Sequence, residues 1–286
     1  MQPDDAKKPV VVCEPDALKG ARPVRWGGAG REASSLPSRI RSSAMLVALL
    51  AGCSAPLTMP DVVSADGSPP DIVMLGEQHD APEHQAMHSR VVTALAARGV
   101  LAAVVLEMAD RGHSTAGLPV QASETEVRQA LGWDEAGWPW PPYRPAVMAA
   151  VAAGVPVLGG NLSRPQLREA RNDTRLDAML PGPALKAQQQ AIRLGHCDLL
   201  PESQIGPMTR MQIARDRSLA ETLAQAAVPG KTVLLLAGGR HIDEKLGVPM
   251  HLPSSLHVLA APLPPEPETK DYCAELERQM KPRPGV

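Results

Sequence analysis

VMLGEQHD, residues 73–80, passes directly from an apolar segment into a cluster of polar side chains. Residues 71–75 have the length and the flanks of a buried strand, and Pro82 stands where the first turn of a helix accepts proline. Apolar positions then recur at helical spacing over residues 82–97. Strand, polar turn and helix in this order form the repeating unit of α/β sheets, so this stretch indicates the fold class.

The same alternation continues along the chain, with further buried strands predicted at 101–106, 156–162, 232–237 and 256–260. Residues 163–227 are predicted to be mostly helical, with the longest helix at 207–227, which is more than one crossover between strands requires. Residues 132–145 are too interrupted by Pro and Trp to predict regular structure. The sequence therefore predicts an α/β domain over residues 71–261, with a mostly parallel sheet, helices on both faces and a small helical cap subdomain.

Polar side chains follow four of these predicted strands: Glu77, His79, Glu107, Asn161, Arg240 and His241. Ligands of an open parallel sheet bind at the carboxyl ends of the strands, so we expect a cleft there. Glu and His serve in general acid–base catalysis, because modest burial brings the pKa of either group toward neutrality. Two imidazoles and a carboxylate, from His79, Glu107 and His241, also suit zinc with one coordination position open.

The predicted helix 82–97 carries His84 and His88 one turn apart, on a shared face. A solvated helix surface explains His88 best, whereas His84 stays a candidate ligand contact. His196 and Cys197 are neighbours in the chain, which favours a packed loop or a ligand contact over a catalytic thiol pair.

Composition limits the classes of function. The chain has 286 residues, 44% of them hydrophobic, and a formal net charge of -2, so nucleic acid is not an expected partner. The four cysteines show no CxxC spacing, which disfavours a zinc ribbon and a disulfide-dense scaffold. One long-range disulfide, such as Cys197 with Cys273, stays open if the compartment is oxidising.

The N-terminal residues read as a targeting segment rather than as part of the fold. Residues 39–53 contain a basic start, a short apolar stretch and small residues before Cys53, the layout of a secretory signal. Residues 54–70 form a Pro/Ser/Gly-rich tether, and residues 262–286 form a Pro-rich tail. Residues 1–38 are expected to be an upstream extension that the natural protein lacks, with the natural start near Leu36.

The motifs together resemble a known family, the ChaN-like haem-binding lipoproteins. The resemblance is carried by GEQHD at 76–80, GW…PPYRP at 137–145, GGNLSRP at 159–165, GHCDLLP at 195–201, MTRMQIARDRSLA at 208–220 and LLLAGGRHIDEKLGVPMHL at 234–252. The ending LAGC also resembles a bacterial lipobox, whose cysteine, here Cys53, carries lipid.

The resemblance implies a haem-binding protein without enzymatic activity, which takes part in haem or iron uptake and encloses haem at the interface of a homodimer. It further implies a tyrosine iron ligand, for which Tyr143 lies in a matching motif, with contacts expected from His84, His196 and Arg240. The lipobox implies a place in the bacterial cell envelope, on the periplasmic side, with lipid on Cys53 holding the protein to the outer membrane.

The fold is also similar to that of the erythromycin-esterase-like and TIKI-type hydrolases. Their sites use Glu and His after the first strand, Glu after the second and a late His, which Glu77, His79, Glu107 and His241 match. The alternative function is therefore a His/Glu hydrolase, with or without a divalent metal such as zinc.

Overall fold

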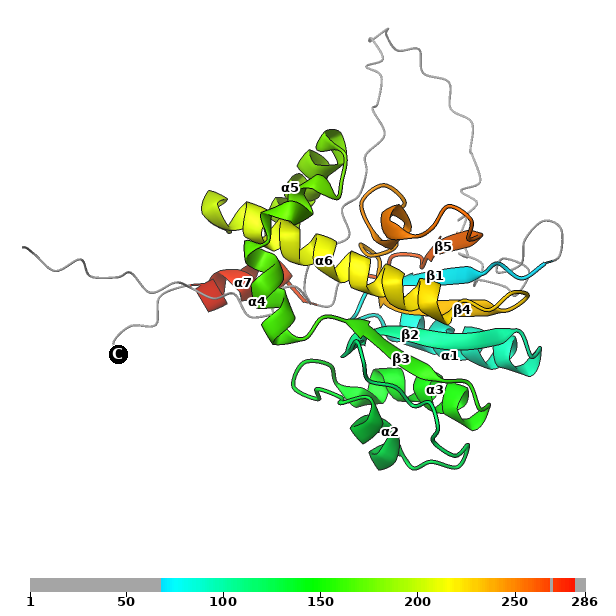
Figure 1. The fold of residues 1–286 in the computed structure, drawn as a ribbon. Helices are drawn as coiled ribbons and strands as arrows, with labels where there is room; N and C mark the ends of the chain where they lie inside the picture. The colour runs from blue at the N-terminus through cyan, green and yellow to red at the C-terminus, as the bar shows by residue number, and fades with distance from the viewer. Residues whose placement is uncertain (1–67, 268–269, 281–286) are drawn as a thin grey trace, which may run out of the picture.

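The computed structural model describes residues 68–267 and 270–280. At its centre is a five-stranded sheet with the order β3-β2-β4-β1-β5, in which every neighbouring pair is parallel (Figure 1). The strands are β1 (Ile72–Glu77), β2 (Leu101–Asp110), β3 (Val157–Asn161), β4 (Thr232–Gly238) and β5 (Val258–Pro262). The α/β class with a parallel sheet, predicted from the sequence, is confirmed.

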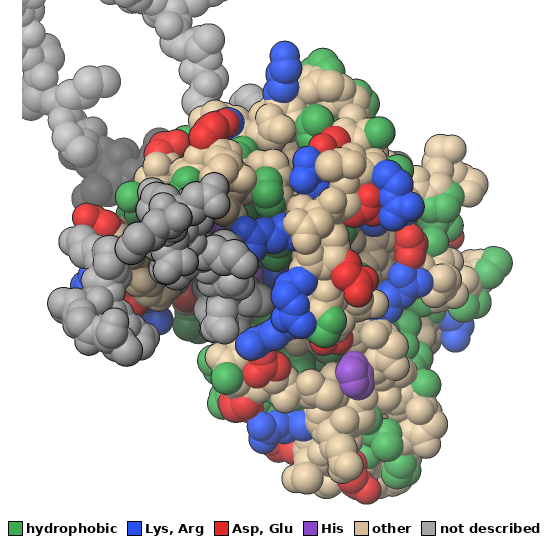
Figure 2. Space-filling model, turned by 60° about the vertical axis from the view of Figure 1, so that its left-hand side comes forward, with side chains coloured by type: hydrophobic (Ala, Val, Ile, Leu, Met, Phe, Trp, Pro, Cys, Tyr) green, Lys and Arg blue, Asp and Glu red, His purple; other side chains and the backbone are tan. Residues whose placement is uncertain are grey.

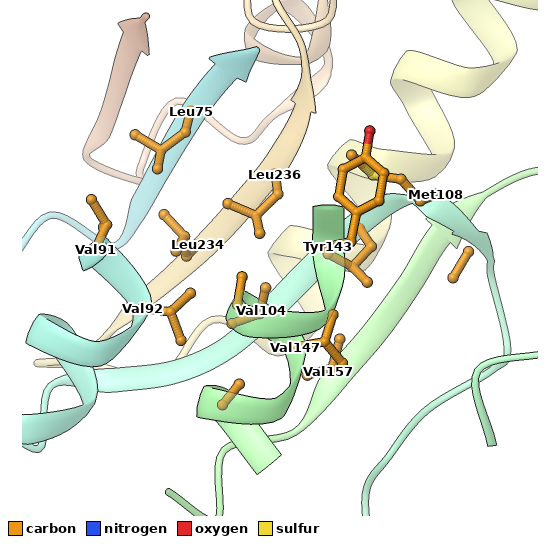
Figure 3. Close-up of a cluster of buried hydrophobic side chains, with 14 of the residues drawn as sticks. Leu75, Val91, Val92, Val104, Met108, Tyr143, Val147, Val157, Leu234 and Leu236 are labelled. Atoms are coloured by element: carbon orange, nitrogen blue, oxygen red, sulfur yellow. The ribbon is translucent and has the colours of Figure 1, made fainter. Parts of the chain in front are cut away.

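Helices connect the strands and cover both faces of the sheet. They are α1 (Pro82–Ala97), α2 (Glu124–Ala130), α3 (Trp140–Ala152), α4 (Arg164–Asn172), α5 (Gly182–Gly195), α6 (Glu202–Ala226) and α7 (Tyr272–Met280), with short 3₁₀ helices η3 (Thr174–Ala178) and η4 (Val248–His251). One core lies between the sheet and α1 with α3, where Val92, Val147 and Leu234 belong to one apolar cluster (Figure 3). The other core places Leu219 and Leu223 of α6 against the opposite face of the same strands.

The alternation of side chains along each strand explains why two cores form. Leu234 and Leu236 of β4 face α1 and α3, while Val233 and Leu235 face α6, and all four are buried. A parallel strand covered on both faces is apolar throughout, which is why the stretch TVLLLA carries no polar–apolar alternation.

The expected helical cap subdomain is present, at one end of α6. Figure 1 shows α6 crossing the sheet and continuing beyond it to α4 and α5. There, Leu167, Ile192 and Met208 form a small apolar cluster of their own. Helix α6 therefore belongs both to the sheet domain and to the helical cap.

Two helix starts differ from those predicted. Helix α3 begins at Trp140, inside the segment that was expected to be irregular, because its prolines Pro141 and Pro142 occupy the first turn, where a missing N–H costs nothing. Helix α6 begins at Glu202 and contains Pro207, the residue expected to start it. In both cases the local sequence predicts a boundary at proline, although packing of the apolar face keeps the helix continuous.

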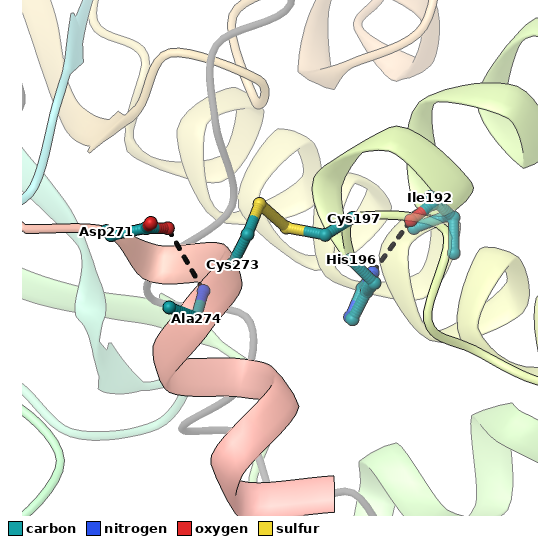
Figure 4. Close-up of a disulfide and its surroundings, with 6 residues drawn as sticks. All are labelled: Ile192, His196, Cys197, Asp271, Cys273 and Ala274. Carbon is teal, nitrogen blue, oxygen red and sulfur yellow. Dashed lines mark hydrogen bonds between the residues drawn. A yellow bond between two sulfur atoms is a disulfide. The ribbon is translucent and has the colours of Figure 1, made fainter.

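The segment expected to be a Pro-rich tail contains helix α7. A disulfide joins Cys273 at the start of α7 to Cys197 in the turn just after α5, with 5.7 Å between the Cα atoms (Figure 4). The bond closes a long loop, since the two cysteines are 76 residues apart. The pairing left open by the sequence is thus the one found in the structure.

Within the described residues, no helix is both long and apolar enough to cross a membrane. The predicted signal segment 39–53, the lipidation site Cys53 and residues 1–38 lie outside the described residues, as does most of the predicted tether 54–70.

Candidate functional site

The carboxyl ends of the three central strands converge on one cluster of acidic and imidazole side chains. Glu77 ends β1, Glu107 lies in the last part of β2, and β4 ends at Gly238, between the other two strands. A Cβ at Gly238 would lie only 2.8 Å from Nε2 of His79. The glycine therefore leaves the space that the His79 ring fills.

Glu77 is the centre of the first half of the cluster. Its Oε1 atom lies 2.6 Å from Nδ1 of His79 and accepts a 2.7 Å hydrogen bond from the Tyr143 hydroxyl. Its Oε2 atom accepts a 3.0 Å hydrogen bond from Nε2 of Gln85 and lies 3.4 Å from Nδ1 of His88. Burial opposes ionisation of Glu77, but the hydrogen bond from His79 and the nearby imidazoles outweigh it and lower the pKa of the carboxyl.

Glu107 is the centre of the second half. Its Oε1 atom lies 3.2 Å from Nε2 of His241, and its Oε2 atom accepts a 2.8 Å hydrogen bond from the backbone N–H of Gly238. On the far side of the ring, Nδ1 of His241 lies 2.5 Å from Oδ1 of Asp216, a residue of α6. His241 is thus held between two carboxylates.

His79 links the two halves, since its Nε2 atom lies 3.8 Å from Oε2 of Glu107. The cluster is therefore a continuous series of alternating acids and imidazoles: Glu77, His79, Glu107, His241 and Asp216. We call these five residues the acid–imidazole chain.

The charges along the acid–imidazole chain follow from burial and from the partners. Burial alone would keep His241 neutral, but Glu107 and Asp216 raise its pKa to about 10. Burial also lowers the pKa of His79, and Glu107 and Glu77 more than reverse that effect, so its pKa is raised. Glu107 stays ionised, because His241 and His79 overcome its burial and hold its pKa well below the usual range.

A pocket of about 320 Å³ opens beside the acid–imidazole chain. His79 and Glu107 form part of its wall, and Trp138 packs edge-on against His79 with 4.9 Å between ring centroids. The remaining wall combines apolar and charged side chains from β2, from the segment before α3, from the turn after β3 and from α4 and α6. They include Met108, Asp110, Asp134, Leu162, Arg164, Leu167 and Arg215. The pocket is thus mixed in character, with an imidazole, an aromatic ring and guanidinium groups.

The structure places the expected haem contacts at different sites. Tyr143 is buried beneath Glu77, and its hydroxyl points away from the aliphatic core toward that carboxylate (Figure 3). Burial, followed by the charge of Glu77, raises the pKa of Tyr143 well above its usual value, which opposes formation of a tyrosinate. His84 is held by the backbone N–H of Gln78 and by the carbonyl of Pro264, each at 2.8 Å, so both ring nitrogens are engaged.

His196 and Arg240 lie outside the acid–imidazole chain and are not among the residues that line the pocket. Nδ1 of His196 is 2.7 Å from the Ile192 carbonyl at the end of α5 (Figure 4). Arg240 donates a 2.8 Å hydrogen bond to the carbonyl of Ala191. The Arg240 contact joins the loop after β4 to α5 of the helical cap, whereas the His196 contact stays within the end of α5.

His88 corrects a prediction, because it is buried rather than solvated. It is 1% exposed and faces Glu77 from helix α1, and neither ring nitrogen has a hydrogen-bond partner within the described structure. Burial lowers the pKa of His88 to about 4, so the ring is neutral at physiological pH.

Asp216, Gln85, Trp138 and Arg215 are site residues that the sequence analysis missed. Asp216 and Arg215 lie on α6, where polar residues recur every three or four positions along a buried face, including Thr209 and Gln212. That polar periodicity is the signal in the sequence that could have identified them.

The zinc site expected from His79, Glu107 and His241 is not supported. Among residues 68–267 and 270–280, no group of three or more His, Cys, Asp or Glu side chains is arranged to hold a metal ion. Both ring nitrogens of His241 face carboxylates, Glu107 on one side and Asp216 on the other.

Comparison with known proteins gives the family. The family described as haem-binding uptake, Tiki superfamily, ChaN matches residues 64–252. A solved structure, described as cofacial heme binding to ChaN of Campylobacter jejuni, is 25% identical to this chain, with a TM-score of 0.57 over 71% of this chain and 84% of that chain. No curated protein matches the chain significantly. Since the family match spans more than half of the sequence and includes every residue of the acid–imidazole chain, the chain belongs to the ChaN haem-binding family of the Tiki superfamily.

Proposed function

We propose that this protein binds haem in the pocket beside His79. Membership of a haem-binding family supports the ligand, and the wall of the pocket supports the place. The observation that carries the proposal is that His79 is the imidazole of this wall and retains partial exposure, with its side chain 20% accessible. The other imidazoles near the strand ends, those of His84, His88 and His241, are buried.

The surroundings of His79 suit a residue that faces an iron atom. An imidazole that binds a metal usually gives its other N–H to a carboxylate, which fixes the ring and makes it more basic. Glu77 is placed to accept the Nδ1–H of His79, and Trp138 packs against the same ring. Met108, Leu162 and Leu167 supply apolar surface for a porphyrin face. When bound, haem would supply an iron centre, and His79 is the residue that would face it.

The size of the pocket supports binding between two copies of the chain. At about 320 Å³ it stands at the lower end of the roughly 300–1,000 Å³ range of sites that enclose a small ligand. A porphyrin macrocycle would fill it and still expose one face to solvent. A second copy presenting the same pocket would cover that face, so we propose a homodimer that shares its haem groups.

We also propose that the protein is a lipoprotein of the bacterial cell envelope that handles haem during iron uptake. The signal-like segment before Cys53 supports the lipid anchor. The Cys197–Cys273 bond supports an oxidising compartment, since disulfides of this kind are rare in the cytosol. Incorporation of labelled fatty acid into the full chain, and its loss in Cys53→Ser, would test the anchor.

A spectrophotometric titration of the full chain with haemin tests the haem proposal. We expect a sharpened and shifted Soret band for the wild type, and a weaker complex for His79→Ala. His257→Ala is the matched control, because His257 is exposed and lies at the opposite end of the sheet, before β5. A wild-type titration without a spectral change would overturn the proposal. Sedimentation with and without haemin would test the dimer.

The acid–imidazole chain favours a second candidate function, a His/Glu hydrolase for an ester or amide. Glu107 is ionised and His79 is biased toward its protonated form, and both line the same pocket. The carboxylate would take a proton from a water molecule that attacks the carbonyl carbon, and the imidazolium would give a proton to the leaving group. Ester hydrolysis that disappears in Glu107→Gln would establish this activity, and equal rates in both proteins would exclude it.

A further inference from the structure

Arg215 is a buried cation that has no partner of its own among the residues that the structure describes. Its side chain is 6% exposed, lines the pocket and comes from the part of α6 that crosses the strand ends. Its Nε atom is enclosed and has no hydrogen-bond partner, and no ion pair within 4.0 Å joins Arg215 to any described residue. Burying a charge is costly unless it is paired and hydrogen-bonded, so an arginine in this state needs an explanation.

Neighbouring arginines on the same helix do have carboxylate partners. Arg210 forms a two-point contact with Asp177, through Nε at 2.9 Å and a terminal nitrogen at 2.8 Å. Arg217 lies 3.7 Å from Glu221. Arg215 is therefore the arginine of α6 that has no carboxylate partner, and it is also the arginine of α6 that lines the pocket.

The acidic groups around Arg215 stabilise its charge from a distance but do not fill its hydrogen bonds. Burial lowers the pKa of Arg215, while Glu107, Asp216 and Asp110 act in the opposite direction. Glu107 and Asp216 already hold His241 between them. A guanidinium has five donors in a planar fork that matches a carboxylate, and here this fork borders open space.

The rest of the pocket does not provide this recognition. Arg164 at the start of α4 is half exposed and lies 3.6 Å from Asp134 across the rim. Figure 2 shows acidic and basic side chains interspersed over the face it draws, rather than a field of one sign. A ligand anion would therefore be selected by a directed contact inside the pocket and not by a general positive charge.

We propose that Arg215 is the anion-recognition residue of this pocket and binds a ligand carboxylate through two parallel hydrogen bonds. The inference rests on the proposed function for the identity of the ligand, and for haem the carboxylate is a propionate. Recognition of the propionate would orient the macrocycle in the pocket, while His79 and Trp138 meet its flat part. It would also neutralise the buried charge, so binding and folding of this region support each other.

Metal-free porphyrins test the inference separately from binding to iron. The full chain is titrated with protoporphyrin IX and with its dimethyl ester, in which both carboxylates are blocked, and tryptophan fluorescence reports binding. For the wild type we expect the diacid to bind at least about tenfold more tightly than the diester, as a charged hydrogen bond contributes that much. For Arg215→Met we expect the diacid to bind about as weakly as the diester does.

Two further variants keep the result interpretable. Arg217→Gln changes an arginine of the same helix that does not line the pocket, and it should keep the wild-type preference for the diacid. Arg215→Lys keeps the charge without the fork and should keep only part of the preference. The ratio of the two affinities does not depend on how much of a variant is folded, so a merely structural role would leave it unchanged.

The porphyrin titrations separate the role of Arg215 from porphyrin binding itself. Equal affinity of the wild type for diacid and diester would overturn the role of Arg215 and leave porphyrin binding intact. A preference that survives in Arg215→Met would do the same. No binding of either metal-free porphyrin would overturn this inference, whereas the haemin titration decides the proposed function separately.

Discussion

Nδ1 of His79 lies 2.6 Å from Oε1 of Glu77, although the two residues are only two positions apart at the end of β1. The glutamate points down into the protein, where Tyr143 and Gln85 donate to it, and the histidine reaches the pocket. The short segment GEQH therefore contributes both a buried anchor and a pocket group. Glu77 therefore fixes the orientation of the His79 ring, which is the imidazole that lines the pocket.

Glu77→Gln should lower the stability of the protein and the pKa of His79. The amide keeps the shape of the carboxyl but loses the charge that raises the pKa of the ring, and it cannot accept every donor now directed at Glu77. We expect a loss of about 1–3 kcal/mol in the free energy of unfolding. Denaturant titration measures the free energy of unfolding, and an NMR titration of the histidines measures the pKa of His79. Glu83→Gln, on the exposed surface of α1, is the control, and an equal result for both variants would refute this role of Glu77.

The stability of the protein should fall on the alkaline side because of His241. Its pKa is raised to about 10 in the folded state, above the usual value of 6.5, so the folded state retains a proton that the unfolded chain releases. The stabilisation that comes from protonated His241 is fully present below about pH 6.5 and is lost as pH rises toward 10. One group changes the free energy of unfolding by at most about 1.4 kcal/mol per pH unit. Urea titrations at several pH values should show the slope, and His241→Gln should flatten it. An unchanged slope in that variant would contradict the assignment.

His88 should make the protein sensitive to acid. Its pKa is lowered to about 4 in the folded state, so the unfolded chain binds a proton first as the solution is acidified. Stability is therefore lost as pH falls from about 6.5 toward 4. His88→Leu should reduce this loss at little cost at neutral pH, because neither ring nitrogen of His88 has a hydrogen bond. Thermal unfolding at pH 7 and pH 5 measures the difference, with His257→Gln as control. Equal acid sensitivity of His88→Leu and the wild type would argue against this account.

Reduction of the Cys197–Cys273 bond should destabilise the protein and release α7. Closing a loop between cysteines 76 residues apart stabilises a folded chain by about 2–4 kcal/mol. The paired variant Cys197→Ser with Cys273→Ser should unfold at a lower temperature than the oxidised wild type, and a reducing agent should have no further effect on it. Cys13→Ser should behave like the wild type. If the reducing agent leaves the unfolding temperature of the wild type unchanged, the disulfide does not stabilise the folded protein.

The sequence predicted well what depends on local pattern. Four of the five strands are apolar runs followed by polar residues, and parallel strands end at the same edge, so Glu77, Glu107 and the end of β4 were expected to converge.

The remainder depends on contacts between distant parts of the chain. Asp216 acquires its role only because α6 crosses the strand ends and places it 2.5 Å from His241. His88 is buried because α1 packs on the sheet with that face inward, which its spacing to His84 alone does not reveal. The prolines of α3 and α6 misled the prediction, since local sequence marks them as helix boundaries and tertiary packing keeps them inside.

The anomalous diffraction of iron in crystals of the haem-loaded protein is the most direct test of the account. We predict an iron peak in the pocket beside the ring of His79, with porphyrin density between Trp138 and the start of α4, and with a second copy of the chain covering the outer face. An iron peak at another place, such as beside Tyr143 or in the helical cap near His196, would contradict the proposed site.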